Sequence, residues 1–227
     1  MRDYNVYSYT IAHYGVDYIG YSLKSIENSV DRLYIFYTPH PSHGHRTNIE
    51  PIESETDLSI EVNKMTGLFG NPNGKLRWYE TDIWNEGQQR DYAVQTLQND
   101  NADLILVVDY DEIWHPHVLD KVLNHVWQMN GARNWLINFT HMWRSFNYAC
   151  KDSNWPVRII DTRHSGGVGY VPTELGDIIH CGYAITDKVL RYKMSIHGHK
   201  DELRPNWYED KWQVWPPVDD CHPTNGK

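Results

Sequence analysis

Hydrophobic and polar positions along the chain follow two different periods, and each period predicts a different kind of element. Residues 4–11 and 32–37 are rich in aromatic and β-branched side chains, which favour β-strands. Between these stretches, Ile19, Leu23 and Ile26 recur at helical spacing and would share one face of a helix. The first forty residues therefore predict a strand, a helix and a strand, which is the unit of a parallel α/β sheet.

The middle of the chain holds the clearest predicted core strand. Residues 104–108 read Leu-Ile-Leu-Val-Val, an unbroken apolar run that is typical of a strand covered on both faces. Pro116 suits the first turn of the next helix, whose apolar stripe is Val118, Leu119, Val122, Leu123 and Val126. Three further strands are predicted at residues 76–79, 135–139 and 157–160. A helix is predicted at 88–98, with Tyr92, Ala93 and Leu97 on its inner side, and a last helix would be capped by Thr186.

Two stretches lack either period. Residues 40–72 contain scattered Pro, Gly, Ser and Asn and predict an irregular insert or flap. Residues 204–227 contain four prolines and predict an extended C-terminal tail. The regular pattern around the insert predicts that residues 1–203 form one α/β domain.

Composition narrows the classes of function. The chain has 21 Lys and Arg against 30 Asp and Glu, and a net charge of −9 disfavours binding to nucleic acid or to an anionic membrane surface. Its three widely spaced cysteines, together with the lack of a signal-peptide pattern or a long apolar run, predict a cytoplasmic protein without a disulfide framework. Sixteen Tyr and ten Trp suit stacking on sugars or bases, and equally suit ordinary packing.

Three carboxylates follow the predicted core strand directly. Asp109, Asp111 and Glu112 would lie at its carboxyl end, where open α/β sheets bind ligands. Acids so close together repel one another unless a cation or strong donors offset their charge. Their oxygens suit Mg²⁺ or Mn²⁺, which would bridge the protein to a substrate diphosphate. The alternative is a set of acids stabilised by the dipole of the helix that begins at Pro116.

Residues 108–112, Val-Asp-Tyr-Asp-Glu, resemble the D-x-D-E signature of glycosyltransferases with the GT-A fold, in the family-2-like branch. Residues 23–35 and 88–93 resemble stretches of that branch in the same order. The late His-Cys-Gly-Tyr-Ala element at 180–184, followed by Lys193 and by residues 195–201, resembles its closing elements. The resemblance spans about residues 4–201 and implies a GT-A-like α/β fold with a mixed, mainly parallel sheet flanked by helices. The closing motif departs from the family pattern, because His197 and His199 compete for one position and Asp201 replaces a glutamate.

The resemblance implies a site for a divalent cofactor, Mn²⁺ or Mg²⁺. Asp111 would ligate the ion, and Asp109 would reach the donor ribose or sugar, or the ion through water. His199 would complete the metal shell, and a histidine ligand favours manganese. His197 is the alternative to His199, and for either histidine the ordinary alternative is surface or core hydrogen bonding. Glu112 would brace the loop.

The resemblance also implies where the nucleotide-sugar donor binds. The end of the first strand would cradle the base, with Tyr9 stacking on it, Thr10 supplying a hydrogen bond and His13 close by. Core packing is the alternative for Tyr9. Arg90 would either hold a donor group or pair with the acids, and pairing is favoured.

Catalysis by inversion needs a carboxylate base that takes a proton from the acceptor hydroxyl. Glu174 and Asp177 lie in the expected stretch, and no motif chooses between them; an ordinary solvated acid is the alternative for each. Trp143 and Arg144 are candidates for the acceptor surface, because aromatic faces stack on sugar rings, with structural packing as the alternative.

These features predict a metal-dependent glycosyltransferase that moves a sugar from a nucleotide-sugar, with a UDP-sugar favoured, to a glycan or other hydroxyl acceptor, with inversion expected. Two other classes stay open at this point: a metal-dependent phosphoesterase or nuclease, and a non-catalytic carbohydrate-binding module. Loop shape sets the donor sugar and the acceptor, so the fold class does not define them.

Overall fold

The strand, helix and strand expected at the start of the chain are present. β1 (Val6–Ala12) and β2 (Arg32–Tyr37) pair in parallel, and the inner face of α1 (Ile19–Ile26) is fully buried. The structure is a computed structural model, and it describes residues 2–39, 49–68, 74–83, 85–129, 131–151, 155–196 and 203–214.

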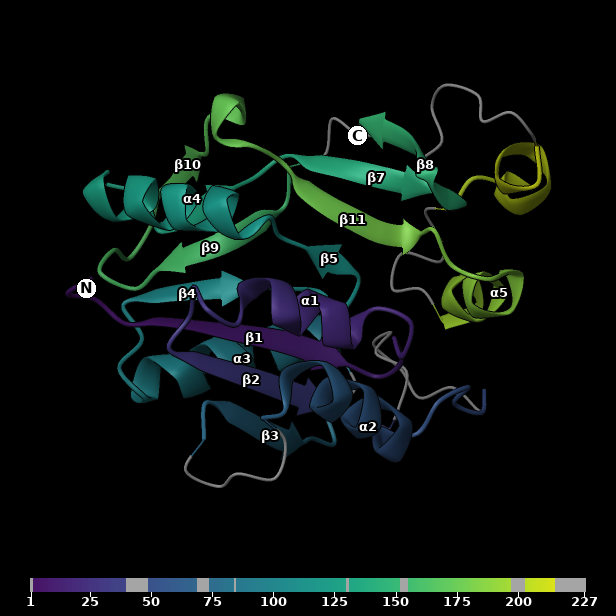
Figure 1. The fold of residues 1–227 in the computed structure, drawn as a ribbon, viewed down its shortest axis with the longest axis horizontal. Coiled ribbons are helices and arrows are strands. Elements are labelled where there is room, and N and C mark those ends of the chain that lie inside the picture. The colour runs from purple at the N-terminus through teal and green to yellow at the C-terminus, as the bar shows by residue number, and fades with distance from the viewer. Residues whose placement is uncertain are drawn as a thin grey trace.

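The larger sheet continues from these two strands. Its other members are β3 (Leu76–Glu80), β4 (Leu104–Val107), β6 (Asn134–Leu136), β9 (Val157–Asp161) and β10 (Val168–Tyr170). Within the described residues the strand order is β10-β6-β9-β4-β1-β2-β3 (Figure 1). β9 is antiparallel to both of its neighbours, and the other pairs are parallel. The predicted mixed, mainly parallel sheet is therefore confirmed, with the apolar strand β4 at its centre.

A smaller sheet was not expected from the sequence. It comprises β5 (Glu112–Ile113), β7 (Phe139–Trp143), β8 (Ser145–Lys151) and β11 (Ile178–Tyr183), in the order β5-β11-β7-β8. The single strand predicted for residues 135–139 is wrong, because the chain leaves the larger sheet after β6 and enters the smaller one at β7. β5 follows the acidic motif, so the motif joins the two sheets (Figure 1).

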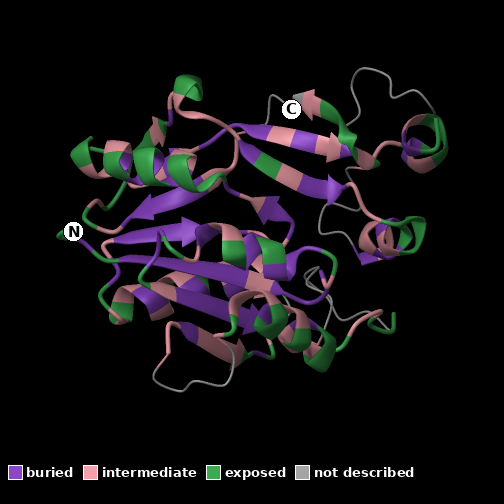
Figure 2. Ribbon diagram, in the orientation of Figure 1, coloured by how far each residue is buried: buried purple, intermediate pink, exposed green. Residues whose placement is uncertain are grey.

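Helices cover both faces of the larger sheet. α1 and α4 (Pro116–Gln128) share one apolar core. Four of the five residues of the predicted α4 stripe, Leu119, Val122, Leu123 and Val126, are buried, and Val118 is half-buried against the same core. α3 (Glu86–Asn99) packs on the opposite face through Ala93 and Leu97. The inward orientation expected for Tyr92 is wrong: this side chain is 41% exposed, and Gln89 is buried instead. Figure 2 shows this division, with buried strands and exposed outer helix surfaces.

The predicted irregular insert contains a helix. α2 (Glu55–Thr66) begins with Ser54 and Asp57 in a reciprocal capping box and ends at Gly67, whose φ is 69°. Its buried residues are Leu58 and Val62. The description of residues 40–72 as irregular is therefore wrong for this segment; residues 40–48 and 69–72 lie outside the described part of the chain.

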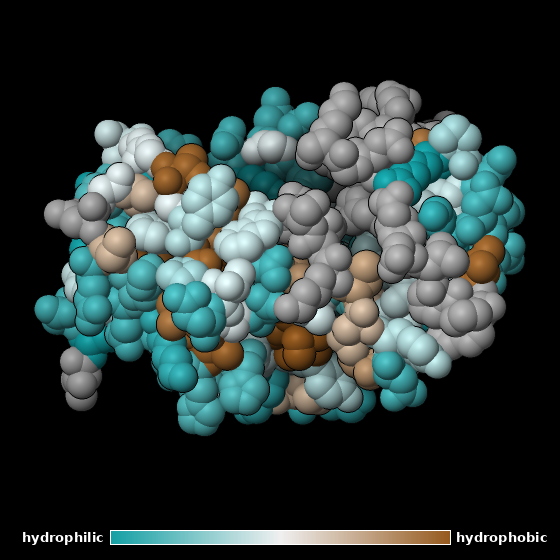
Figure 3. Space-filling model, turned by 90° about the horizontal axis from the view of Figure 1, so that it is seen from above, coloured by the Kyte–Doolittle hydropathy of each residue, from teal (hydrophilic) through white to brown (hydrophobic). Residues whose placement is uncertain are grey.

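The end of the described chain is also more regular than predicted. A short helical segment, Tyr208–Trp212, follows the last helix, α5 (Asp187–Ile196), and residues 215–227 are not described. None of the helices in the described ranges is long and apolar enough to cross a membrane. On the face drawn in Figure 3, hydrophobic residues are scattered among hydrophilic ones, as on ordinary protein surfaces.

Candidate active site

The acidic motif follows the end of β4, where its parallel pairing with β1 stops. β4 pairs with β1, and the Val108 amide donates a 3.0 Å hydrogen bond to the Tyr9 carbonyl just beyond the last paired residues. The chain then turns, with the Glu112 amide donating to the Asp109 carbonyl at 3.0 Å. α1 anchors the same turn, because Ser22 Oγ donates to the Asp109 carbonyl at 3.2 Å. The strand order thus brings the motif to the expected edge of the sheet.

Asp109 is paired with two arginines. Its Oδ1 accepts a hydrogen bond from Arg90 Nη2 at 3.1 Å, and its Oδ2 accepts one from Arg158 Nη2 at 2.6 Å. Burial opposes ionisation of this carboxyl, but the charges of Arg158 and Arg90 outweigh burial and lower its pKa. Asp109 is therefore an ionised, fixed carboxylate, and the pairing favoured for Arg90 is present.

Glu112 holds the motif together from inside. Its side chain is fully buried, and its Oε1 accepts a 2.8 Å hydrogen bond from Arg158 Nε. Its Oε2 accepts from the Asp109 amide at 3.3 Å, which braces the turn. Burial raises the pKa of Glu112 to about 8, although Arg158 acts in the opposite direction. These contacts are structural, as expected for this residue.

Asp111 faces away from the arginines, toward α5 and β11. Only 3% of this residue is exposed, and its Oδ2 lies 3.3 Å from Lys193 Nζ. On the other side, its Oδ1 lies 3.6 Å from His180 Nε2. Gly182 keeps this space open, because a Cβ there would lie 2.6 Å from Asp111 Oδ2 and 2.7 Å from Lys193 Nζ. Any residue larger than glycine at position 182 would fill the space between Asp111 and Lys193.

His180 is held in the neutral form with a fixed orientation. Burial lowers the pKa of His180 to about 3, despite the opposing charge of Asp111. Its Nδ1 lies 2.7 Å from Nδ1 of His141, so one ring donates a hydrogen bond to the other. Its ring also stacks on Phe139, with 5.2 Å between the ring centroids. Nε2 therefore points at Asp111 as a neutral imidazole nitrogen.

Two of these residues could ligate a metal ion. A carboxylate oxygen and a neutral imidazole nitrogen facing one another are a donor pair that suits Mn²⁺ better than Mg²⁺. Over the described ranges, no group of three or more His, Cys, Asp and Glu that could hold an ion is found. Both oxygens of Asp109 are paired with arginine. Asp111 and His180 therefore fit as two ligands, while His197 and His199 lie outside the described residues.

The residues expected to bind the donor lie at or near the end of β1. Tyr9 is buried beneath α3, and burial raises its pKa while the adjacent Arg90 lowers it. Thr10 is fully buried, and its Oγ1 has no hydrogen-bond partner among the described residues. His13 Nδ1 donates to the Thr38 carbonyl at 2.9 Å, and its Nε2 accepts from the Tyr192 hydroxyl at 2.6 Å. His13 thus ties the end of β1 to α5.

The candidate bases lie elsewhere. Glu174 is exposed in a short 3₁₀ helix, Thr173–Leu175. Asp177 Oδ2 accepts a 3.0 Å hydrogen bond from Thr140 Oγ1. Because side chains alternate along β7, Thr140 points to the face of the smaller sheet opposite His141. Asp177 is therefore paired on the side of the smaller sheet away from His141, and Glu174 faces solvent.

The candidate acceptor residues lie in an aromatic cluster on the smaller sheet. Trp143 is 1% exposed and packs with Tyr183, Trp207 and Trp212. Arg144 has a φ of 55°, and its guanidinium lies 4.8 Å from the centre of the Trp212 ring. Packing, the alternative considered, accounts for Trp143, whereas Arg144 is exposed and its role in binding an acceptor stays a prediction.

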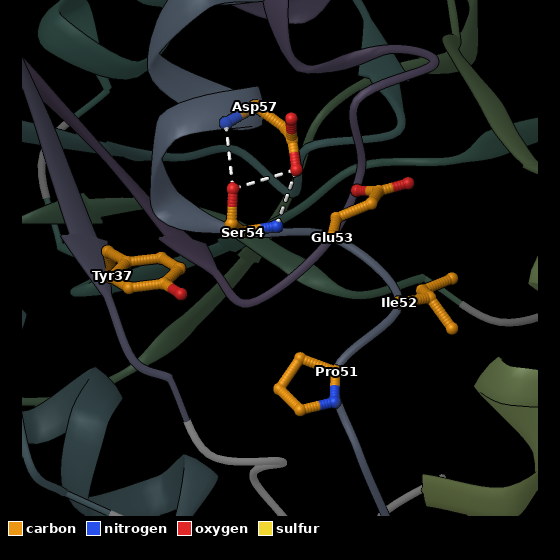
Figure 4. A pocket seen from close by; sticks show the side chains of 6 residues that line it. All are labelled: Tyr37, Pro51, Ile52, Glu53, Ser54 and Asp57. Carbon is orange, nitrogen blue, oxygen red and sulfur yellow. Dashed lines mark hydrogen bonds between the residues drawn. The ribbon is translucent and has the colours of Figure 1, made fainter.

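A pocket of about 400 Å³ lies at the end of β2, lined by Tyr37, Pro51, Ile52, Glu53, Ser54 and Asp57 (Figure 4). Glu53 Oε2 accepts hydrogen bonds from the amides of Gly15 and Val16, at 2.6 and 2.9 Å. Adjacent amides of this kind form an anion-binding position, and here the chain's own carboxylate occupies it.

Sequence reasoning missed four residues of this site as functional positions. His180 and Lys193 lie within stretches used for the resemblance, but no role was assigned to them. Arg158 had a local signal, since a charged residue in the apolar strand Val-Arg-Ile-Ile must find a buried partner. His141 had no local signal, because its pairing with His180 arises only when β7 and β11 meet.

No protein-family model and no curated protein matches the sequence. Solved structures that resemble it include glucosyl-3-phosphoglycerate synthase from Mycobacterium tuberculosis, in complex with Mn²⁺, uridine diphosphate and phosphoglyceric acid. The two structures have a TM-score of 0.47 and 11% sequence identity, and the match covers 87% of this chain and 76% of that chain. The 4-diphosphocytidyl-2C-methyl-D-erythritol synthase from Anaerococcus prevotii has a TM-score of 0.44 and 8% identity, covering 87% and 99%.

A mycobacterial protein has a TM-score of 0.39 and 16% identity over 63% of this chain, which spans 42% of the mycobacterial chain. At such low scores and identities, these likenesses carry no argument about activity. The strand order and pairing of this chain define its α/β fold.

Proposed function

We propose that this protein is a metal-dependent glycosyltransferase that takes a sugar from a nucleotide-sugar, with a UDP-sugar favoured, and passes it to a hydroxyl of a glycan or other acceptor, with inversion. The observation that carries the proposal is the buried carboxylate of Asp111, in the turn that follows β4 where its pairing with β1 stops. This carboxylate faces His180 across a space that Gly182 keeps open. The resemblance of residues 108–112 to the D-x-D-E signature supports the same reaction.

Asp111 and His180 would hold the divalent ion, and the ion, when bound, would stabilise the negative charge of the diphosphate leaving group. His141 keeps the His180 ring oriented toward Asp111. Asp109, held ionised by its arginines, is an acceptor for a ribose or sugar hydroxyl of the donor. Thr10 supplies a buried hydroxyl near the expected nucleotide position.

The base that accepts the proton of the acceptor remains a prediction, with Glu174 and Asp177 as its candidates. A two-metal phosphoesterase is less favoured, because such sites use several carboxylates as ligands. Here both oxygens of Asp109 are engaged by arginines.

Asp111→Asn tests the proposal. The change keeps the size of the side chain and removes the anionic ligand. We expect Mn²⁺-dependent release of nucleoside diphosphate from UDP-sugars to fall by about 10²-fold or more, with the fold retained by circular dichroism. Asp120→Asn, an exposed acid on α4, is the matched control and should keep wild-type activity. Wild-type Mn²⁺-dependent release in Asp111→Asn would refute this mechanism, and so would a wild-type protein that turns over no nucleotide-sugar in a full donor screen.

A further inference from the structure

Lys193 occupies an unusual position for a lysine. It lies in the last turn of α5, its side chain is 14% exposed, and its ammonium group is 3.3 Å from Asp111 Oδ2. The same ammonium group lies 3.3 Å from the Gly182 carbonyl and 5.3 Å from the centre of the Tyr183 ring. The ammonium group is therefore largely enclosed by protein and directed at a buried carboxylate, whereas most lysines extend into solvent.

The charge of Asp111 requires a counter-charge. A buried carboxylate without a cation is strongly unfavourable, and Arg90 and Arg158 contact Asp109, on the other side of the turn. On the other oxygen of Asp111, the His180 ring lies farther away, with 3.6 Å between its Nε2 and Oδ1. Lys193, whose ammonium group is 3.3 Å from Oδ2, therefore supplies a permanent positive charge beside this carboxylate.

The same position is where a divalent ion would have to act. An ion ligated by Asp111 would lie within a few ångströms of the ammonium group, and two positive charges at that separation repel strongly where water is excluded. The lysine stem is long and flexible, and the Gly182 carbonyl and the Tyr183 ring already lie beside the ammonium group. The ammonium can therefore move off the carboxylate without leaving all of its partners.

We propose that Lys193 is the resident counter-ion of Asp111 and competes with the divalent ion for this carboxylate, so that Lys193 sets the metal affinity of the site. The proposal rests on the proposed function in that it takes Asp111 as a metal ligand. In the metal-free protein Lys193 keeps the buried acid neutralised. Only a cation that binds the carboxylate more strongly than an ammonium group displaces it, which favours divalent over monovalent ions.

The test measures Mn²⁺ binding directly, without nucleotide, by electron paramagnetic resonance of the full chain. Lys193→Met removes the competing charge and should bind Mn²⁺ about tenfold more tightly than wild type, or better. Lys188→Met is the matched control, because Lys188 is an exposed lysine of the same helix; it should bind like wild type. The double variant Asp111→Asn/Lys193→Met should lose the gain.

Thermal melting gives an independent readout. Without metal, Lys193→Met should melt below wild type, because Asp111 is left as an unpaired buried charge. Mn²⁺ should restore its melting temperature through binding to the folded state. The double variant, which removes both charges, should melt above Lys193→Met and should not respond to Mn²⁺.

If Lys193 is only a structural ion pair, Lys193→Met will lose stability and Mn²⁺ will not restore it. That result overturns the proposal, as does a Lys193→Met protein that binds Mn²⁺ no more tightly than wild type or stays unfolded even with Mn²⁺. These results are separate from the donor assays: tighter Mn²⁺ binding by Lys193→Met in a protein that hydrolyses no nucleotide-sugar would support the counter-ion role and refute the glycosyltransferase.

Discussion

Arg158 is the residue on which the acidic motif depends most. Its guanidinium contacts both Asp109 and Glu112, and its side chain is only 9% exposed. A motif of three adjacent acids would otherwise repel itself. One buried arginine from β9 therefore allows these acids to lie at the end of a buried strand.

Replacing Arg158 with Met should destabilise the protein strongly. The change removes the hydrogen-bond donor of the fully buried Glu112 and one of the two arginines paired with Asp109, and leaving a buried polar group without its partner costs about 1–3 kcal/mol, and more where the group is charged. Urea unfolding measures the loss. Arg191→Met, which breaks the exposed pair with Asp187, is the control and should cost no more than about 1 kcal/mol. Equal effects of the two variants would show that the buried pairing is not what stabilises the motif.

At the scale of elements, the sequence predicted best where an apolar period was strong. The stripe of α4 is buried as expected because four apolar residues mark one face. α2 was missed because only Leu58 and Val62 are buried on it, which is too few for a clear helical period. Ser54 and Asp57 form its capping box, so the sequence did mark where the helix begins, although it lacked the apolar period that marks a helix face.

Ser54→Ala tests how far this cap stabilises α2. Ser54 Oγ accepts from the Asp57 amide at 3.2 Å, and the Asp57 carboxylate accepts from the Ser54 amide at 2.8 Å. Losing the side-chain half should lower the free energy of unfolding by about 1 kcal/mol, measured in urea. Ser59→Ala lies inside the same helix, where its hydroxyl donates to the Thr56 carbonyl; it should change stability by no more than about 0.5 kcal/mol. A Ser54→Ala protein as stable as Ser59→Ala would rule out a contribution from the cap.

At the scale of the whole molecule, the sequence predicted the edge of the sheet at which the acidic motif lies. It did not predict which distant residues contact the motif there. Asp109 and Asp111 could be placed because they follow an apolar strand, and parallel strands end on the same edge. Lys193 and His180 could not be placed, since each is more than 65 positions away and reaches the motif only through the smaller sheet and α5. Long-range pairing of this kind leaves no local pattern to read.

The many tyrosines of this chain should make its stability fall in alkali. Burial raises the pKa of Tyr18 to about 12, and raises that of Tyr192 to about 12 as well. An unfolded tyrosine titrates near pH 10, so the folded state holds these protons more tightly between about pH 10 and 12. Their contribution to stability is present below pH 10 and is lost as the pH rises through that range.

Tyr18→Phe isolates one such group. Its hydroxyl donates to the Ala184 carbonyl, so the variant should be less stable at neutral pH, where this hydrogen bond is intact. Because the variant has no proton to lose, its stability should fall less steeply than that of wild type between about pH 10 and 12. Tyr21→Phe, three residues further along and 53% exposed, is the control and should follow the wild-type slope. Urea unfolding at stepped pH measures both, and parallel curves for Tyr18→Phe and wild type would show that Tyr18 ionises alike in the folded and unfolded chain.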